Sequence, residues 1–244
     1  MDILRVISLL LDYPQPQLQL VSNDLLAIVQ QSGLSTAQQQ QVSQFITQRC
    51  QSDIMDWQSE YDGLFERGRS LSLLLFEHLH GESRDRGQAM VDLMNQYQQA
   101  GLDIGVRELP DYIPLYLEFL STQGDENAQL GLAEVAHILS VLLCRLEQRD
   151  SNYQALLGAL IELSGVPVEL APLREQLKTE KPDNTREALD KVWEEEMVTF
   201  GPGADKEGCA SNSQPTETQR RDQHVPLQWT DATKAPRSNV TSGV

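Results

Sequence analysis

The chain has 244 residues, of which 40% are hydrophobic, so it can bury a core without help from disulfides or metals. The formal net charge is −17. From Gly201 onward five acidic and five basic residues cancel, so residues 1–200 carry the whole excess, with 31 acidic against 14 basic residues. Such a charge repels nucleic acid and anionic membranes and favours cationic partners, although ordinary acidic solubility explains it equally well.

The cysteines and the N-terminus indicate the compartment. Cys50, Cys144 and Cys209 lie far apart and form no Cys-x-x-Cys pair, which argues against a disulfide framework or a zinc site. The N-terminal apolar run ends at Leu11 and has Asp2 where a secretion signal would carry basic residues. No later stretch approaches twenty uncharged apolar residues. We therefore expect a soluble, cytoplasmic protein.

Apolar residues recur with helical spacing along residues 1–200, and β-branched alternation is scarce. The pattern predicts one all-α domain over residues 1–200, a single globular bundle of about nine to eleven helices. In chain order, the expected helical segments are 3–11, 17–31, a glutamine-rich segment from Ser35, 53–65, 70–80, Ser83 to about 100, 111–120, 126–148, 151–163, 170–177 and 185–198.

Two of these segments are apolar on most sides, which indicates helices surrounded by protein. They are Ser70–His80 and the longer 126–148, which we expect to be the central core helix, with Leu130 among its core residues. In the helix after Ser83 we expect four side chains to face inward: Met90, Leu93, Met94 and Tyr97.

Residues 107–120 open a helix in an unusual way. Pro110 bars Leu109 from helical angles, and Asp111 is a natural N-cap for the helix that follows. Pro114 then falls in the first turn, where its missing N–H costs nothing. The helix carries an aromatic stripe with two carboxylates beside it: Tyr112, Tyr116, Phe119, Glu108 and Glu118. This corner suits a peptide-binding groove, and it has no nucleophile or phosphate-binding loop.

The region from Gly201 to Val244 is rich in Gly, Pro, Ser, Thr and Asn and has few aliphatic residues. It cannot offset its ordering entropy by burial, so we predict a disordered C-terminal tail. Its one apolar island, Val225–Trp229, is either a docking motif or incidental. A generic helical scaffold that works through this tail is one alternative for the function of the chain.

A second alternative is a helical metal-dependent enzyme that uses His78, His80 and Glu82. Metal ligands on a helix need i, i+4 spacing, and two histidines two residues apart point about 200° from each other. A carboxylate pair such as Glu108 and Asp111 also lacks a neighbouring nucleophile or cofactor motif. The chain has no phosphate loop and no Gly-x-Ser-x-Gly, so we expect no enzyme.

Arg84 and Arg86 fall in the first turn of their expected helix, where the helix dipole disfavours cations. That conflict indicates that both arginines pair with carboxylates, either on a neighbouring helix or on a binding partner. A purely structural salt bridge explains them equally well.

Three segments together resemble one family. They are Tyr61-x-x-Leu64-Phe65, residues 70–90 (SLSLLLFEHLHGESRDRGQAM) and residues 108–120 (ELPDYIPLYLEFL). The second and third are similar to the signatures of the NarJ type of molybdoenzyme assembly chaperone, dedicated to respiratory nitrate reductase. The first is shared with the wider TorD-like superfamily of redox-enzyme maturation proteins. Tyr112 is a departure, because the wider superfamily often has histidine there, and no role of that histidine is carried over.

The resemblance extends over about residues 1–200 and implies an all-helical chaperone that is not part of the finished enzyme. Such proteins bind the N-terminal segment of the apo catalytic (α) subunit, a remnant of a twin-arginine-like signal. They hold it in the cytoplasm while the molybdenum cofactor and iron–sulfur clusters are inserted. The cofactor belongs to the client, so no stably bound cofactor is expected. The expected partners are the apo subunit and cofactor-delivery proteins, with no nucleic acid and no membrane insertion.

The expected client groove combines the Tyr61–Phe65 element, the Ser70–His80 helix and the Pro110–Phe119 corner. Its apolar contacts would be Tyr61, Leu64 and Phe65, and its aromatic wall Tyr112, Tyr116 and Phe119. Its charged and polar groups would be Glu108, Asp111 and Glu118, with Arg84 and Arg86 orienting them or the client. Glu77, His78 and Pro110 complete the predicted set.

Overall fold

The computed structural model describes residues 1–79, 84–102, 104, 108–181, 183–188 and 190. All of them belong to one unit, Met1–Glu196. This part of the chain forms eleven α-helices and one π-helical turn and contains no strand, so the all-α class is confirmed. The predicted tail from Gly201, its island Val225–Trp229 and most of the helix expected over 185–198 lie outside the described residues. The domain boundary at residue 200 stays a prediction.

The first half of the fold is a run of short helices. Their bounds are α1 Asp2–Leu11, α2 Pro16–Leu20, α3 Ser22–Gln31, α4 Thr36–Gln51, α5 Ile54–Tyr61 and the π-helical turn η1, Asp62–Glu66. One helix was expected over 17–31, and the chain instead breaks at Val21 (φ −103°, ψ 12°). The break lets α2 pack on α4 while α3 packs on both α4 and α1.

Two predicted helix starts are confirmed by their caps. The Ser35 hydroxyl accepts a hydrogen bond from the N–H of Gln38 (3.3 Å), and the Asp53 carboxylate accepts one from the N–H of Met55 (2.8 Å). Each cap satisfies one of the backbone N–H groups that a helix leaves without a partner in its first turn.

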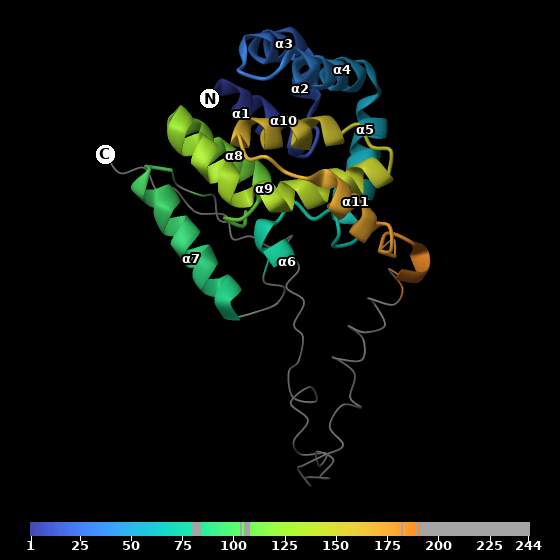
Figure 1. Ribbon diagram of the computed structural model, residues 1–244. Coiled ribbons are helices and arrows are strands. Elements are labelled where there is room, and N and C mark those ends of the chain that lie inside the picture. The colour runs from blue at the N-terminus through green and yellow to red at the C-terminus, as the bar shows by residue number, and fades with distance from the viewer. Residues whose placement is uncertain (80–83, 103, 105–107, 182, 189, 191–244) are drawn as a thin grey trace, which may run out of the picture. The chain divides into compact units, whose positions relative to one another are not determined.

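The second half of the fold is arranged around one long helix. The bounds are α6 Leu75–Leu79, α7 Arg84–Gln99, α8 Ile113–Thr122, α9 Asp125–Gln148, α10 Gln154–Ser164 and α11 Leu170–Leu177. Four helices, α6, α8, α10 and α11, pack against α9, which confirms it as the central core helix (Figure 1). Leu130 is 63% exposed, so its expected place in the core is wrong. It lies about 200° around the helix from buried Ala128 and Leu132.

Within the described residues, α9 alone is long and apolar enough to cross a membrane by length and composition. Half of its most apolar window is buried inside the protein. Four other helices pack on it, so its apolar character is that of a core helix.

The segment 70–80 is not the continuous helix that its sequence predicted. Only α6 is helical, and Leu74 forms an isolated antiparallel bridge with Tyr112. The main-chain hydrogen bonds of residues on either side of Leu74 lead to a distant segment. The N–H of Ile113 donates to the carbonyl of Leu73 (2.8 Å), and the N–H of Leu75 donates to the carbonyl of Asp111 (2.9 Å). Apolar residues on all sides indicate burial, and a short buried run of this kind can be non-helical.

The helix after Ser83 ends at Gln99, two residues before the predicted stop at Gly101. Leu93 and Tyr97 are buried as expected. Met94 is 41% exposed, so its expected inward position is wrong, because it lies about 100° around the helix from Leu93.

An aromatic cluster links the core to the region described next. Phe45 contacts Tyr153, Tyr153 contacts Phe65, and Phe65 contacts Tyr61, with ring centroids 4.9, 5.0 and 4.9 Å apart. The Trp57 indole N–H donates to the Tyr153 hydroxyl (2.7 Å). These contacts hold the turn η1 rigidly against α4 and the start of α10. The two described cysteines, Cys50 and Cys144, are free thiols.

Candidate functional site

The three segments of the family resemblance meet at two tyrosines. The Tyr61 hydroxyl donates to the carbonyl of Leu11 (3.0 Å) and lies 3.2 Å from the Tyr112 hydroxyl. Tyr112 in turn donates to a carboxylate oxygen of Asp12 (2.9 Å). The bridge between Leu74 and Tyr112 brings the second segment to the same place. The end of α1, the α5–η1 junction, the start of α6 and the start of α8 therefore form one site.

The apolar residues predicted for client contact lie beneath this surface. Tyr61, Leu64 and Phe65 are 1%, 9% and 7% exposed, and the rings of Tyr61 and Phe65 pack on Tyr153. They support the site from below. A client that contacts them directly must first displace the side chains that cover them.

Asp111 does not cap its own helix, which corrects the sequence prediction. The helix α8 has Tyr112 at its N-cap, without a side-chain cap, and Pro114 in its first turn as expected. The bridge at Tyr112 places Asp111 over the start of α6, where its carboxylate accepts the N–H of Phe76 (3.0 Å). Asp111 is fully buried, and its other oxygen has no hydrogen-bond partner among the described residues.

This environment shifts the pKa of Asp111. Burial raises the pKa of its carboxyl group, and the neighbouring charge of Glu77 raises it further. The Phe76 N–H and the charge of Arg86 act in the opposite direction, without reversing the shift. A cation that reaches this buried carboxyl group would favour its charged form.

Arg86 forms an ion pair with Glu77 of α6 at 3.7 Å. Glu77 is thus a carboxylate partner on a neighbouring helix, one of the two kinds of partner expected for Arg86. The pair is partly buried, with 21% and 27% of the two side chains exposed. The side chain of Arg84 lies outside the described residues.

His78 is held by the main chain. Its Nε2 atom is 2.8 Å from the carbonyl oxygen of Ser72, and burial lowers the pKa of the ring. The other two residues of the metal hypothesis, His80 and Glu82, lie outside the described residues. Within the described part of the chain, no three His, Cys, Asp or Glu residues are placed to hold a metal ion.

Two of the three residues of the predicted aromatic wall face inward, and Tyr112 is half-buried. Tyr116 and Phe119 are 7% and 9% exposed; the Tyr116 hydroxyl donates to the carbonyl of Gly131 in α9 (3.1 Å), and the Phe119 ring packs on Tyr97 of α7. The two predicted carboxylates, Glu108 and Glu118, are exposed. The accessible part of the site is therefore acidic, and the aromatic part is structural in this conformation.

The sequence prediction missed three residues of the site. Tyr97 donates to the carbonyl of Pro110 (2.8 Å) and so fixes the corner. Tyr13, 38% exposed, packs its ring edge-on against Tyr61 at 5.6 Å, beside exposed Asp12. The available signal was the Asp-Tyr-Pro step directly after an apolar helix, which we used only to end that helix.

A pocket of about 400 Å³ opens beside the site, between α6, α9 and α11. Its lining includes Glu77 and His78 of α6 together with His137 and Arg145 of α9. Two of the predicted site residues thus stand at the edge of a hollow.

A comparison of the sequence with protein-family models identifies the family of this chain. The model of the family described as "Nitrate reductase delta subunit" matches residues 31–157, just over half of the chain. The matched range includes all three segments that meet at the site. This chain belongs to the nitrate reductase delta subunit family.

Two assembly chaperones resemble the chain over most of its length. The probable nitrate reductase molybdenum cofactor assembly chaperone NarW of Escherichia coli (strain K12) is 43% identical over 233 residues, 95% of this chain and 97% of NarW. The chaperone NarJ of the same strain is 44% identical over 219 residues, 89% of this chain and 91% of NarJ. The resemblance to NarJ-type chaperones is therefore confirmed. A crystal structure of a putative redox enzyme maturation protein from Archaeoglobus fulgidus aligns with a TM-score of 0.48 and 21% identity, over 67% of this chain and 92% of that one.

The hydrogen bond between the Tyr61 and Tyr112 hydroxyls predicts that substitutions of the two tyrosines are energetically coupled. We expect Tyr61→Phe and Tyr112→Phe each to lower the free energy of unfolding by about 0.5–1.5 kcal/mol. The double variant should lose at least about 0.5 kcal/mol less than the sum, because both hydroxyls belong to one network. Urea unfolding of the four proteins measures this coupling. Strict additivity would mean that the two hydroxyls act independently.

Proposed function

We propose that this chain is a dedicated cytoplasmic assembly chaperone for membrane-bound respiratory nitrate reductase. It binds the N-terminal segment of the apo catalytic subunit and keeps that subunit competent for insertion of the molybdenum cofactor and iron–sulfur clusters. It is not an enzyme and not part of the finished complex. The names of relatives that match nearly the whole chain support this proposal.

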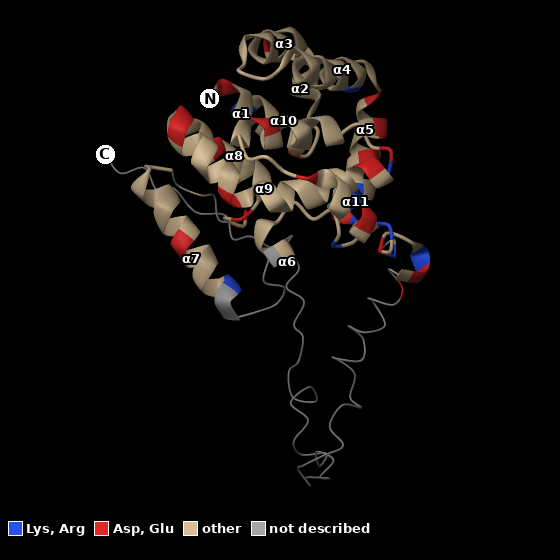
Figure 2. Ribbon diagram, in the orientation of Figure 1, with Lys and Arg blue, Asp and Glu red and all other residues tan. Residues whose placement is uncertain are grey.

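The observation that carries the client-binding part is the meeting of the three segments at one acidic surface. Asp12 is exposed there and accepts a hydrogen bond from the half-buried Tyr112 hydroxyl, while Glu108 is exposed on the segment that leads into α8 and Glu118 is exposed on α8 itself. Acidic residues are spread over most of the helices (Figure 2). A basic N-terminal segment, such as a twin-arginine-like remnant, has the complementary charge. An amphipathic client helix would add apolar contacts by displacing the side chains that cover Leu64 and Phe65.

The chaperone residues act by binding and orientation only. The exposed carboxylates attract and align the basic segment, and the buried Asp111 offers an unpaired oxygen to a client cation that enters between α6 and α8. The molybdenum cofactor is cargo of the client.

Calorimetric titration with a synthetic peptide from the N-terminus of the catalytic subunit of the host's nitrate reductase tests the proposal. We expect one-to-one binding at micromolar affinity or tighter, which corresponds to about 8 kcal/mol or more. Binding should weaken with salt and be absent for a scrambled peptide. If the folded chaperone binds neither peptide, this client is wrong.

The same titration locates the surface. Glu108→Gln with Glu118→Gln should weaken binding roughly threefold to tenfold without changing Tm, because rim charges contribute less than about 1 kcal/mol each. The matched control is Asp24→Asn with Glu169→Gln, which removes two exposed acids on other elements. Equal loss in both double variants would show that net charge alone, and not this surface, attracts the peptide.

A further inference from the structure

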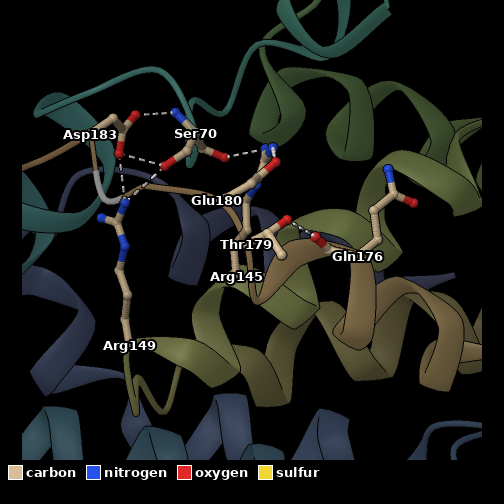
Figure 3. A network of polar contacts seen from close by, with 7 residues as sticks. All are labelled: Ser70, Arg145, Arg149, Gln176, Thr179, Glu180 and Asp183. Carbon is tan, nitrogen blue, oxygen red and sulfur yellow. Dashed lines mark hydrogen bonds and ion pairs between the residues drawn. The ribbon is translucent and has the colours of Figure 1, made fainter.

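A short segment after α11 lies across Arg145 of α9 and Arg149, the residue that directly follows α9. We call it the strap and define it as Lys178–Lys181 together with Asp183. The two carboxylate oxygens of Glu180 accept hydrogen bonds from Nε and Nη2 of Arg145, at 3.0 and 2.8 Å. Asp183 accepts from Nη2 of Arg149 at 2.9 Å. Figure 3 shows both pairs side by side, with Ser70 between them.

The Asp183 carboxylate sits in a fitted cradle. It accepts hydrogen bonds from the N–H and the hydroxyl of Ser70, both at 2.7 Å. Gly68 (φ +89°) closes the cradle, and a Cβ atom there would stand 2.6 Å from a carboxylate oxygen. Burial by itself raises the pKa of Asp183, but the Ser70 hydrogen bonds and the charge of Arg149 outweigh it, so the pKa is lowered. The cradle therefore selects a charged carboxylate.

The ion pair between Arg145 and Glu180 divides a larger hollow. On one side lies the pocket of about 400 Å³ described above, and on the other a pocket of about 240 Å³. Ser70, Arg145 and Glu180 line both. Moving the Glu180 side chain away would join the two pockets into one groove.

The groove is basic within an acidic protein. Its basic lining consists of Arg69, Arg145, Arg149 and Lys181 of the strap, together with His78 and His137, and its acidic lining residues are Glu77 and Glu180. One arginine side chain can bind one carboxylate through two parallel hydrogen bonds, as Arg145 and Glu180 show. The blue residues in Figure 2 gather at this end of the structure, around the end of α11 and the segment after it.

The strap is held by contacts that can exchange. Glu180 and Asp183 are 41% and 30% exposed, and ion pairs at such exposure contribute about 1 kcal/mol or less. Leu177, 4% exposed, anchors the strap at its start. The carboxylates can therefore leave while α11 stays in place.

We propose that this groove binds an extended acidic segment of a partner protein, and that the strap occupies it as an internal competitor. The matching chemistry is a peptide with two carboxylates three residues apart, set against two arginines four residues apart, Arg145 near the end of α9 and Arg149 directly after it. The inference does not rest on the client proposed above, whose segment is basic.

The probe is a labelled synthetic peptide with the strap's own sequence, residues 177–190 (LKTEKPDNTREALD). Its anisotropy is followed with the full chain and with the full chain carrying Glu180→Gln and Asp183→Asn. In the native chain the tethered strap competes at an effective concentration in the millimolar range. We expect the neutralised variant to bind the peptide at least about tenfold more tightly, and added salt to weaken binding.

Three controls make the result specific. Glu175→Gln removes an exposed acid that pairs with Lys178 and contacts neither arginine, and it should bind like the native chain. A probe with Gln and Asn in place of the two acids should not bind. Arg145→Gln with Arg149→Gln, added to the neutralised variant, should abolish binding, with a thermal melt to confirm folding.

Three outcomes overturn the proposal. In the first, the neutralised variant melts cooperatively but does not bind the peptide. In the second, the neutral probe binds as well as the acidic one. In the third, inorganic phosphate binds the neutralised variant and the acidic peptide does not, which assigns the arginines to small anions.

Discussion

Replacing Tyr97 by alanine is expected to lower the free energy of unfolding by about 3–5 kcal/mol, a large part of the total for a domain of this size. Among the described side chains of α7, only Leu93 and Tyr97 are buried. Tyr97 is fully buried, packs its ring on Phe119 at 4.7 Å, and donates to the carbonyl of Pro110. It thus joins α7 to the corner that begins α8. In a thermal melt the loss corresponds to a fall in Tm of roughly 6–20 °C.

Tyr97→Phe separates packing from hydrogen bonding. It keeps the ring but leaves the Pro110 carbonyl without its donor, which should cost about 1–3 kcal/mol. Circular dichroism during urea unfolding measures both variants. If Tyr97→Ala costs no more than Tyr97→Phe, the ring does not anchor α7 and this account of the corner is wrong.

At Asp111, removing the carboxyl group and removing only its charge should have opposite effects on stability. Asp111→Ala removes the carboxylate that accepts the hydrogen bond from the N–H of Phe76, at a cost of about 1–3 kcal/mol. Asp111→Asn keeps an acceptor oxygen for that N–H and removes the buried charge. We therefore expect the asparagine variant to be at least as stable as the native chain at pH 7, and to bind the client peptide less well.

The pH dependence checks this explanation. The pKa of Asp111 is raised in the folded protein, so its contribution to stability is fully present below the unfolded-state pKa of about 3.9 and is lost as pH rises through the folded-state pKa. The stability gained by Asp111→Asn should therefore grow between pH 4 and pH 7. Unfolding curves across that range measure it. A gain that is the same at every pH would show that the charge of Asp111 is not what destabilises the site.

Much of the helical order could be predicted because its determinants are local. The caps at Ser35 and Asp53 act within three residues, and the apolar stripe of α9 repeats over the length of the helix. The segment before α6 was mispredicted because its determinants are distant. Leu73 and Leu75 bond to residues near Tyr112, and nothing in the local pattern of 70–80 reveals that pairing.

The same distinction between local and distant determinants explains which features of the site could be predicted. Helical spacing correctly placed Tyr116 and Phe119 near one another, with ring centroids 6.4 Å apart, but it does not say whether that face meets solvent or the core. Asp111 met the local rule for an N-cap, yet its carboxylate bonds to an N–H in α6. Asp12 and Tyr13 were missed because their part in the site depends on how the end of α1 meets Tyr61 of α5 and Tyr112, which lie far away in the sequence.

The bridge between Leu74 and Tyr112 has a further consequence for α6 and α7. Both helices lie on an excursion of the chain that leaves after Leu74 and returns at Asp111, and main-chain hydrogen bonds close this excursion at its base. Those bonds join main-chain atoms, so substitutions other than proline leave their donors and acceptors in place. The two ends of this excursion are therefore already held together when α7 forms. Ordering α7 then costs only the conformational entropy of a segment that is tethered at both ends. An opening of α7 is for the same reason a local event, a separate cooperative unit that hydrogen exchange can resolve from the unfolding of the α8–α10 core.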